Sequence, residues 1–163
     1  YKAKFLELHL LTNSEIMAIS KKAKVRFFSN DVQTSLRNRS TLKEFIKSIF
    51  KKENKRFDFI NYIFCSDKNL LTINKKFLNH DFYTDVITFN LSENNKHISA
   101  EVYVSLDRVR DNAKKNGASL TSELHRVLFH AALHLCGYDD KKKIEIERMR
   151  KKEDELLAKY FAH

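Results

Sequence analysis

Residues 129–140 read FHAALHLCGYDD, a stretch in which two histidines, a glycine and two aspartates follow closely on one another. A helix is predicted from about residue 120, because apolar residues recur at helical spacing as Leu124, Val127, Leu128, Ala131 and Leu135. On that helix His130 and His134 lie on the same face, with Cβ atoms about 5–6 Å apart. Gly137 is expected to end the helix, because glycine tolerates a positive φ.

A turn after Gly137 can bring Asp140 back toward the two imidazoles. Two nitrogens and one carboxylate oxygen suit a tetrahedral zinc ion, with nickel, cobalt and manganese as substitutes. Three protein ligands leave the fourth position open to water, as in catalytic zinc sites. We therefore predict one zinc ion per chain, held by His130, His134 and Asp140, with a metal-bound water that is activated for hydrolysis. Asp139 is an alternative third ligand, and histidine pairs at this spacing also occur on helices that bind no metal.

The spacing of these residues is also similar to that of the metzincin proteases. In that pattern a glutamate follows the first histidine directly and acts as the general base. Here the corresponding residue is Ala131, so a bound water lacks the group that accepts its proton during peptide hydrolysis. The sequence therefore disfavours a metallopeptidase, with a base from elsewhere in the fold as the remaining alternative.

The chain of 163 residues contains 31 lysines and arginines against 21 acidic residues, a formal net charge of +10. A balance this basic favours a polyanionic partner, most often nucleic acid or the ribosome. The alternative is a lysine-rich surface that is simply solvated. Charge alone does not decide between these two interpretations.

The remaining totals are typical of one globular domain. No apolar run approaches the roughly 18 residues that a membrane span needs, so none is expected. Cys65 and Cys136 do not form a disulfide framework, and two lone thiols fit a reducing cytoplasm. Met17 is typical of a natural start, so residues 1–16 are interpreted as a leader added for expression. We expect a single domain over residues 17–163.

Local patterns predict both strands and helices. We predict strands at 24–29, 56–66, 84–91 and 97–104, and helices at 40–55, 69–78, 106–116, 120–136 and from 141 onward. Thr41 and Glu44 are expected to form a capping box. Ser66 and Asp67 are expected to cap the second helix, and Ser105 the third.

The segment 97–104 shows the clearest strand pattern. One face of this strand is expected to carry Ile98, Ala100, Val102 and Val104, and the other Ser99, Glu101 and Tyr103. Because strands and helices mix along the chain, the sequence indicates an α+β or α/β sheet covered by helices.

The motif that ends the fourth predicted helix resembles that of the YbeY family of bacterial endoribonucleases. The family motif H-G-x-L-H-L-x-G-Y-D-H corresponds here to HAALHLCGYDD. Upstream, INKKFLNHDFYTDVITF is similar to the family's segment before its central strand, and AEVYVSLDRVRDNA to the next strand and helix. The resemblance covers about residues 17–160.

The resemblance implies a metal-dependent endoribonuclease, specific for single-stranded RNA, that acts in ribosomal RNA maturation and ribosome quality control. Its implied partners are single-stranded ribosomal RNA and the small ribosomal subunit in the cytoplasm. The implied fold is α+β and zincin-like, a small mixed sheet of about four strands packed with about five helices. By position, the implied metal ligands are His130, His134 and Asp140.

Three positions depart from the family pattern. The third ligand is usually histidine and is Asp140 here; a carboxylate is an acceptable zinc ligand but makes a bound water less acidic. The glycine after the first histidine is Ala131. An arginine that could clamp phosphate is replaced by Leu78, and Lys75, Lys76 or His80 are the available substitutes.

Basic side chains near the motif are expected to hold the RNA backbone. We assign this role to Lys75, Lys76 and Arg126, and consider 141–143 as well, with a plain solvated surface as the alternative for each lysine. Phe82 and Tyr83 could stack on bases, although core packing is favoured for both. The rival function is a non-catalytic basic RNA- or ribosome-binding protein with a structural metal, which Leu78 favours.

Overall fold

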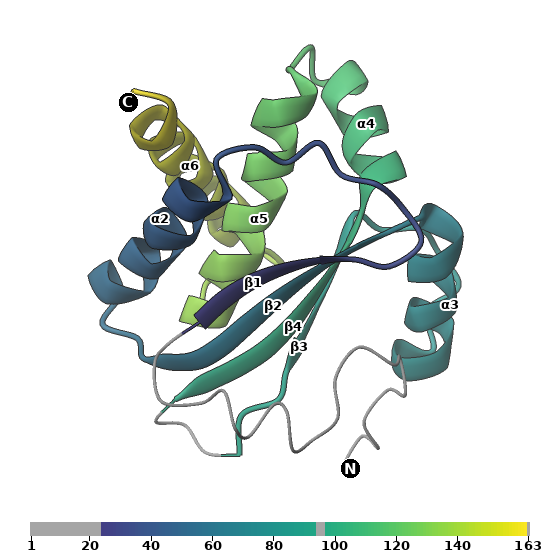
Figure 1. The fold of residues 1–163 in the computed structure, drawn as a ribbon, viewed down its shortest axis with the longest axis horizontal. Coiled ribbons are helices and arrows are strands. Elements are labelled where there is room, and N and C mark those ends of the chain that lie inside the picture. Colours follow the sequence, from purple (N-terminus) through teal and green to yellow (C-terminus); the bar gives the residue numbers. More distant parts are fainter. Residues whose placement is uncertain (1–23, 94–96, 163) are drawn as a thin grey trace.

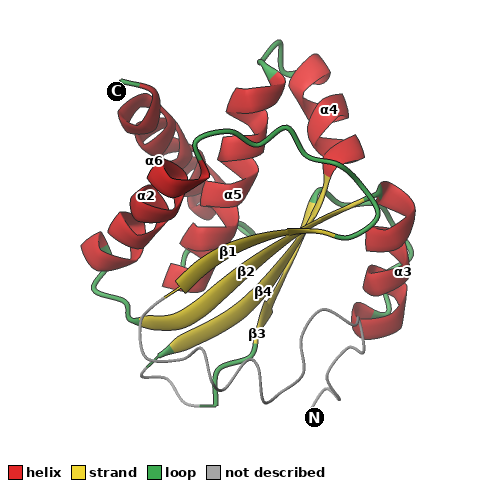
Figure 2. Cartoon of the chain, viewed as in Figure 1, coloured by secondary structure: helices red, strands yellow, loops and turns green. Residues whose placement is uncertain are grey.

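The computed structural model describes residues 24–93 and 97–162, which form a four-stranded mixed sheet packed with five helices (Figures 1 and 2). The leader expected at 1–16 and the start expected at Met17 lie outside the described residues. The α+β class is confirmed. The elements are β1 (Lys24–Ser29), α2 (Arg39–Lys52), β2 (Phe57–Cys65), α3 (Asp67–Leu78), β3 (Val86–Asn90), β4 (Ile98–Ser105), α4 (Leu106–Lys115), α5 (Leu120–Cys136) and α6 (Lys143–Phe161).

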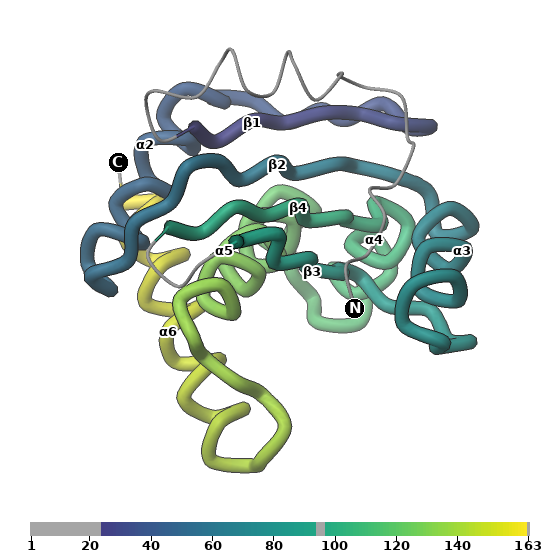
Figure 3. Tube along the Cα trace, turned by 90° about the horizontal axis from the view of Figure 1, so that it is seen from below, coloured from purple at the N-terminus to yellow at the C-terminus, as the bar shows by residue number. Residues whose placement is uncertain are grey.

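The strands lie in the order β1-β2-β4-β3, which Figure 3 shows from below. β1, β2 and β4 are parallel, whereas β3 runs antiparallel to β4 and forms one edge of the sheet. Just before β3, the Asp85 carbonyl accepts a hydrogen bond of 2.8 Å from the Ser105 amide at the end of β4. This pairing fixes Asp85 at the edge of the sheet where β4 passes into α4.

Two apolar clusters cover the two faces of the sheet. The main core joins the sheet to α2, α5 and α6 and takes Ala100, Val102 and Val104 from β4. The second core joins it to α3 and takes Tyr103 from β4. Because successive strand residues point to opposite faces, this division confirms the alternation predicted for this strand.

Helix α5 is anchored firmly against the sheet. Phe129 is fully buried and packs on Phe45 of α2, with ring centroids 5.1 Å apart. The Tyr62 hydroxyl of β2 donates a buried hydrogen bond of 3.1 Å to the Leu128 carbonyl. These contacts involve the two residues directly before His130, so the backbone that carries this histidine is held by the core.

The expected helix caps are confirmed in two places and wrong in one. The hydroxyls of Ser66 and Ser105 accept amide hydrogen bonds at the starts of α3 and α4. The capping box of Thr41 and Glu44 does not form, because α2 begins earlier, after a left-handed Asn38 with φ of 50°. Thr41 therefore lies within the first turn, and Glu44 accepts a 2.7 Å hydrogen bond from Lys47 instead.

The two cysteines are free and buried. Burial raises the pKa of each thiol to about 12, so Cys65 and Cys136 stay protonated at neutral pH. Across residues 24–93 and 97–162, no helix has both the length and the hydropathy to cross a bilayer.

Candidate metal centre

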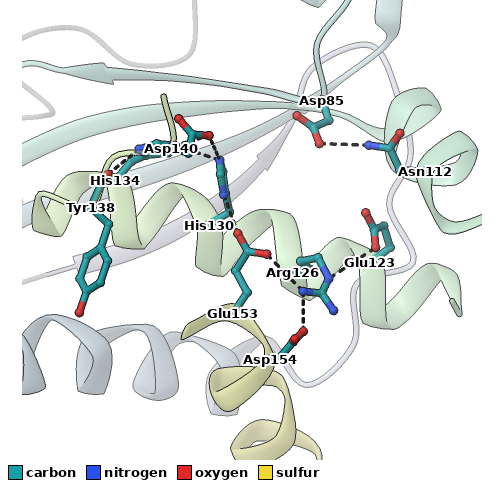
Figure 4. A network of polar contacts seen from close by, with 10 residues as sticks. All are labelled: Asp85, Asn112, Glu123, Arg126, His130, His134, Tyr138, Asp140, Glu153 and Asp154. Atoms are coloured by element: carbon teal, nitrogen blue, oxygen red, sulfur yellow. Dashed lines mark hydrogen bonds and ion pairs between the residues drawn. The ribbon is translucent and has the colours of Figure 1, made fainter. Parts of the chain in front are cut away.

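Three side chains converge where α5 ends. The Nε2 atoms of His130 and His134 are 2.9 Å apart, and Asp140 Oδ2 lies 3.7 Å from the first and 3.5 Å from the second (Figure 4). Ligands bound tetrahedrally to zinc at roughly 2.0–2.1 Å lie roughly 3.3–3.4 Å from one another. The cluster is half-buried and could hold a metal ion.

The turn after α5 explains how Asp140 reaches the histidines. Gly137 has a φ of 101°, which L-residues with side chains rarely adopt. Its amide donates to the His134 carbonyl (2.9 Å) and the Tyr138 amide donates to the Leu133 carbonyl (3.1 Å), the two hydrogen bonds of a Schellman motif. The helix end predicted at Gly137 is therefore confirmed, and the chain folds back toward its own last turn.

Hydrogen bonds to the other ring nitrogens orient both imidazoles. His134 Nδ1 donates to the Tyr138 carbonyl over 2.8 Å, and His130 Nδ1 donates to Glu153 Oε1 over 2.7 Å. Because a carbonyl or carboxylate oxygen only accepts, each Nδ1 carries a proton, and in the neutral imidazole each Nε2 then keeps its lone pair. Both lone pairs belong to the atoms that face Asp140, as metal ligation requires.

Glu153 of α6 is buried next to these ligands, with 6% of its surface exposed. Its second oxygen lies 3.2 Å from Arg126 Nη1, which is also 2.8 Å from Asp154 Oδ1. Burial alone lowers the pKa of His130, but the hydrogen bond and charge of Glu153, together with the charges of Asp85 and Asp140, outweigh burial and raise that pKa. Glu153 thus holds His130 by both geometry and charge.

A cavity of about 320 Å³ opens beside the cluster. His130 and Asp140 line it together with Asp85, Glu123 and Arg126. Glu123 is 4% exposed, and burial raises the pKa of its carboxyl against the opposing charge of Arg126. The cavity therefore places two further carboxylates beside a site that could hold a cation.

Sequence reasoning missed three residues of this site. Glu123 precedes His130 by two helical turns on the same helix face, so its spacing was a usable signal. Asp85 lies just before β3 and Glu153 lies in α6, and Glu153 is 23 residues from its partner His130. No local pattern connects residues on separate elements, so neither could be found from spacing.

The three basic residues predicted to bind RNA lie in different surroundings. Lys75 forms a 2.7 Å ion pair with Asp81, and the Lys76 ammonium lies 5.3 Å from the centroid of the Phe77 ring. Both lie on the exposed side of α3, whereas the Arg126 guanidinium lies among carboxylates in the cavity. Their role in binding RNA stays a prediction.

The prediction that Phe82 and Tyr83 pack in the core is wrong. These side chains are 56% and 53% exposed, because the chain after α3 runs over the surface before it enters β3. Leu78, which stands where the resemblance places an arginine, is 41% exposed at the last residue of α3.

Taken together, the fold and the cluster define an α+β protein whose donor set is that of a metal-dependent hydrolase. The sequence model of the family described as Endoribonuclease YbeY matches residues 24–161. The chain belongs to the YbeY family of endoribonucleases.

Individual relatives match over nearly their whole length. The endoribonuclease YbeY of Cytophaga hutchinsonii is 46% identical over 138 residues, which is 85% of this chain and 96% of the relative. That of Flavobacterium johnsoniae is 43% identical over 133 residues, with 82% and 95% covered. A solution structure from Thermotoga maritima is similar with a TM-score of 0.62 and 28% identity, covering 85% of this chain and 90% of that one.

Proposed function

We propose that this protein is a metal-dependent endoribonuclease that cuts single-stranded RNA during ribosomal RNA maturation and ribosome quality control. It works in the cytoplasm, on or near the small ribosomal subunit, as a single domain over residues 17–163. The observation that carries the proposal is the convergence of His130, His134 and Asp140. Membership of an endoribonuclease family supports the reaction class.

Zinc is the ion that this donor set fits best. Two imidazole nitrogens with one carboxylate oxygen form a three-ligand set, which leaves one position open to a reactant. When bound there, zinc supplies a Lewis acid that activates water near neutral pH and polarises a phosphate oxygen. Asp140, in place of the histidine usual in the family, brings a negative charge that favours retention of the cation.

Residues of the chain orient the two imidazoles and accept the proton that the attacking water loses. Tyr138 and Glu153 hold the imidazoles in the tautomer that presents Nε2. Ala131 leaves no glutamate next to His130 to accept a proton. We assign that task to Glu123, because it lines the same cavity and burial raises the pKa of its carboxyl.

The proposal is tested by incubating purified protein with a fluorescent single-stranded RNA, with and without a chelator. We expect cleavage that stops on chelation and returns with added zinc, while a fully paired RNA of the same sequence stays intact. If the protein has full metal content and binds the RNA but never cuts it, the result supports the non-catalytic RNA-binding alternative. That alternative is favoured by Leu78, which stands where the family usually has an arginine.

Binding to RNA should weaken steeply with salt. Because the net charge is +10, the protein should displace cations that are condensed on RNA when it binds. The logarithm of its RNA-binding constant should therefore fall linearly with the logarithm of the salt concentration. Replacing Lys75 and Lys76 together by glutamine should reduce the salt slope by about 1–2. The measurement is fluorescence anisotropy on metal-free protein, which avoids cleavage.

Lys47→Gln is the control for this double variant. Lys47 is also an ion-paired lysine, but it lies on α2 and pairs with Glu44. Its removal should leave the salt slope unchanged. A wild-type affinity that is flat with salt would show that the positive charge does not act on phosphates.

A further inference from the structure

Two aromatic rings stand exposed on the segment that joins α3 to β3. Phe82 is 56% and Tyr83 is 53% exposed, and both follow the exposed Leu78 closely. Burying such rings normally stabilises a protein, so their exposure side by side on one short segment is informative. Neither ring belongs to the main core or the second core.

The backbone of this segment is held in place by α3. The buried Asn74 donates its side-chain amide to the Phe82 carbonyl over 2.9 Å, and its own carbonyl accepts from the His80 amide over 3.3 Å. The ion pair of Lys75 with Asp81 adds a third attachment at 2.7 Å. The rings are thus presented on a fixed support, so little ordering entropy is lost when a ligand binds them.

Each ring has a partner on one side. The His80 ring stacks on Phe82 with centroids 5.0 Å apart and planes inclined by 23°. The Arg108 guanidinium lies over the Tyr83 ring, 4.7 Å from its centroid, and is itself held by Asp67 through a 2.7 Å ion pair. Since both rings remain more than half exposed, each keeps surface for a flat ligand.

The segment that carries the exposed rings leads to the cavity beside the candidate metal centre. Asp85 follows Tyr83 by two residues and lines the cavity that also contains His130 and Asp140. The Asp85 carboxylate accepts a 3.1 Å hydrogen bond from Asn112 of α4, which fixes the end of the segment at the cavity (Figure 4). Phe82 and Tyr83 therefore lie two or three residues before a residue that lines this cavity, on the same short segment.

We propose that Phe82 and Tyr83, backed by His80 and Arg108, form a stacking platform for unpaired bases of RNA. This inference rests on the proposed function and names how its substrate is held. Aromatic rings stack on any base, and a guanidinium behind one ring adds attraction for the anionic strand. Bases in a duplex are already stacked on each other, so the platform selects single strands.

Charge favours RNA over an apolar protein partner as the occupant. Lys75, paired with Asp81, and Arg108, paired with Asp67, lie beside the platform, and the whole chain carries a net charge of +10. A patch that docks on a hydrophobic partner is depleted of charge at its centre. Here two exposed lysines, Lys75 and Lys76, lie in the last turn of α3 just before the segment, and lysine is among the residues depleted at protein interfaces.

The test measures binding of a fluorescent single-stranded RNA to metal-free protein by anisotropy. Tyr83→Ala and Phe82→Ala should each weaken binding about tenfold, whereas Tyr83→Trp should keep it within about twofold. The control is Phe161→Ala: Phe161 is 49% exposed at the end of α6, on the other side of the molecule from α3 (Figure 1). Its removal should not change RNA affinity.

A second RNA, with abasic sites in place of its bases, separates stacking from charge or misfolding. Wild-type protein should bind the abasic strand about as weakly as the two alanine variants bind the normal one, and the variants should not discriminate between the strands. An equal loss by the variants on both strands, or no loss at all, overturns the platform. Zinc affinity and melting temperature should match the wild type in all variants.

The experiments distinguish an error in the platform from an error in the proposed function. If wild-type protein cuts single-stranded RNA while the alanine variants bind as tightly as wild type, only the platform is wrong. If wild-type protein neither binds nor cuts RNA, both are wrong.

Discussion

His130→Ala is expected to leave the protein without stoichiometric zinc and without nuclease activity. The substitution removes one of three ligands, and the remaining pair, His134 and Asp140, cannot enclose an ion on their own. The loss in zinc affinity should exceed the roughly 10–100-fold that removal of a group outside the ligand set costs. Elemental analysis of purified protein gives the metal content, and cleavage of a fluorescent single-stranded RNA gives the activity.

Matched variants show whether this effect belongs to the cluster. His97→Ala removes an exposed histidine that pairs with Asp58, and it should retain full zinc content. Asp140→Ala should lose zinc while Asp139→Ala keeps it, which decides between the two aspartates as third ligand. Zinc at full occupancy in His130→Ala would falsify the proposed ligand set.

Glu153→Leu is expected to weaken zinc binding about 10–100-fold, although Glu153 touches no ion. Its carboxylate accepts the Nδ1 proton of His130 over 2.7 Å, and without an acceptor the imidazole is free to rotate or to place its proton on Nε2. Glu153→Gln keeps an acceptor oxygen but loses the charge, so its effect should be smaller. Competition with a chromogenic chelator measures the affinity.

Asp154→Asn is the control for Glu153. Both residues contact Arg126, but Asp154 is exposed and does not touch His130. Nitrogen-15 NMR of the histidine rings should show a changed His130 tautomer in Glu153→Leu and an unchanged one in Asp154→Asn. Equal zinc affinity in Glu153→Leu and wild type, with the fold intact by thermal melting, would exclude the orienting role.

Most of the fold could be predicted because its signals are local. The apolar stripe of α5, the alternation of β4 and the left-handed end at Gly137 are each read within a few residues. The capping box of Thr41 failed because α2 begins directly after Asn38, which adopts a left-handed backbone and makes no side-chain cap hydrogen bond. Core packing was predicted for Phe82 and Tyr83 because aromatic residues are usually buried, but both are exposed.

The candidate site was only partly predictable for the same reason. His130, His134 and Asp140 lie within one helix end and its turn, so their spacing carries their geometry. Asp85 and Glu153 reach the site only because β3 and α6 pack beside α5, which depends on the whole fold. Residues that meet through tertiary packing have no fixed separation in sequence, and one sequence alone does not pair them.

The contact between Glu153 and His130 couples the docking of α6, the last described helix, to the binding of a metal ion at this site. Glu153 reaches His130 only while α6 lies against α5, so the docked helix and the bound ion each increase the population of the other. By thermodynamic reciprocity, a partner that pulled α6 away from α5 would weaken the binding of a metal ion at this site, and removal of that ion would weaken the docking of α6. Displacement of this one helix would then lower the proposed nuclease activity without any ligand entering the cavity.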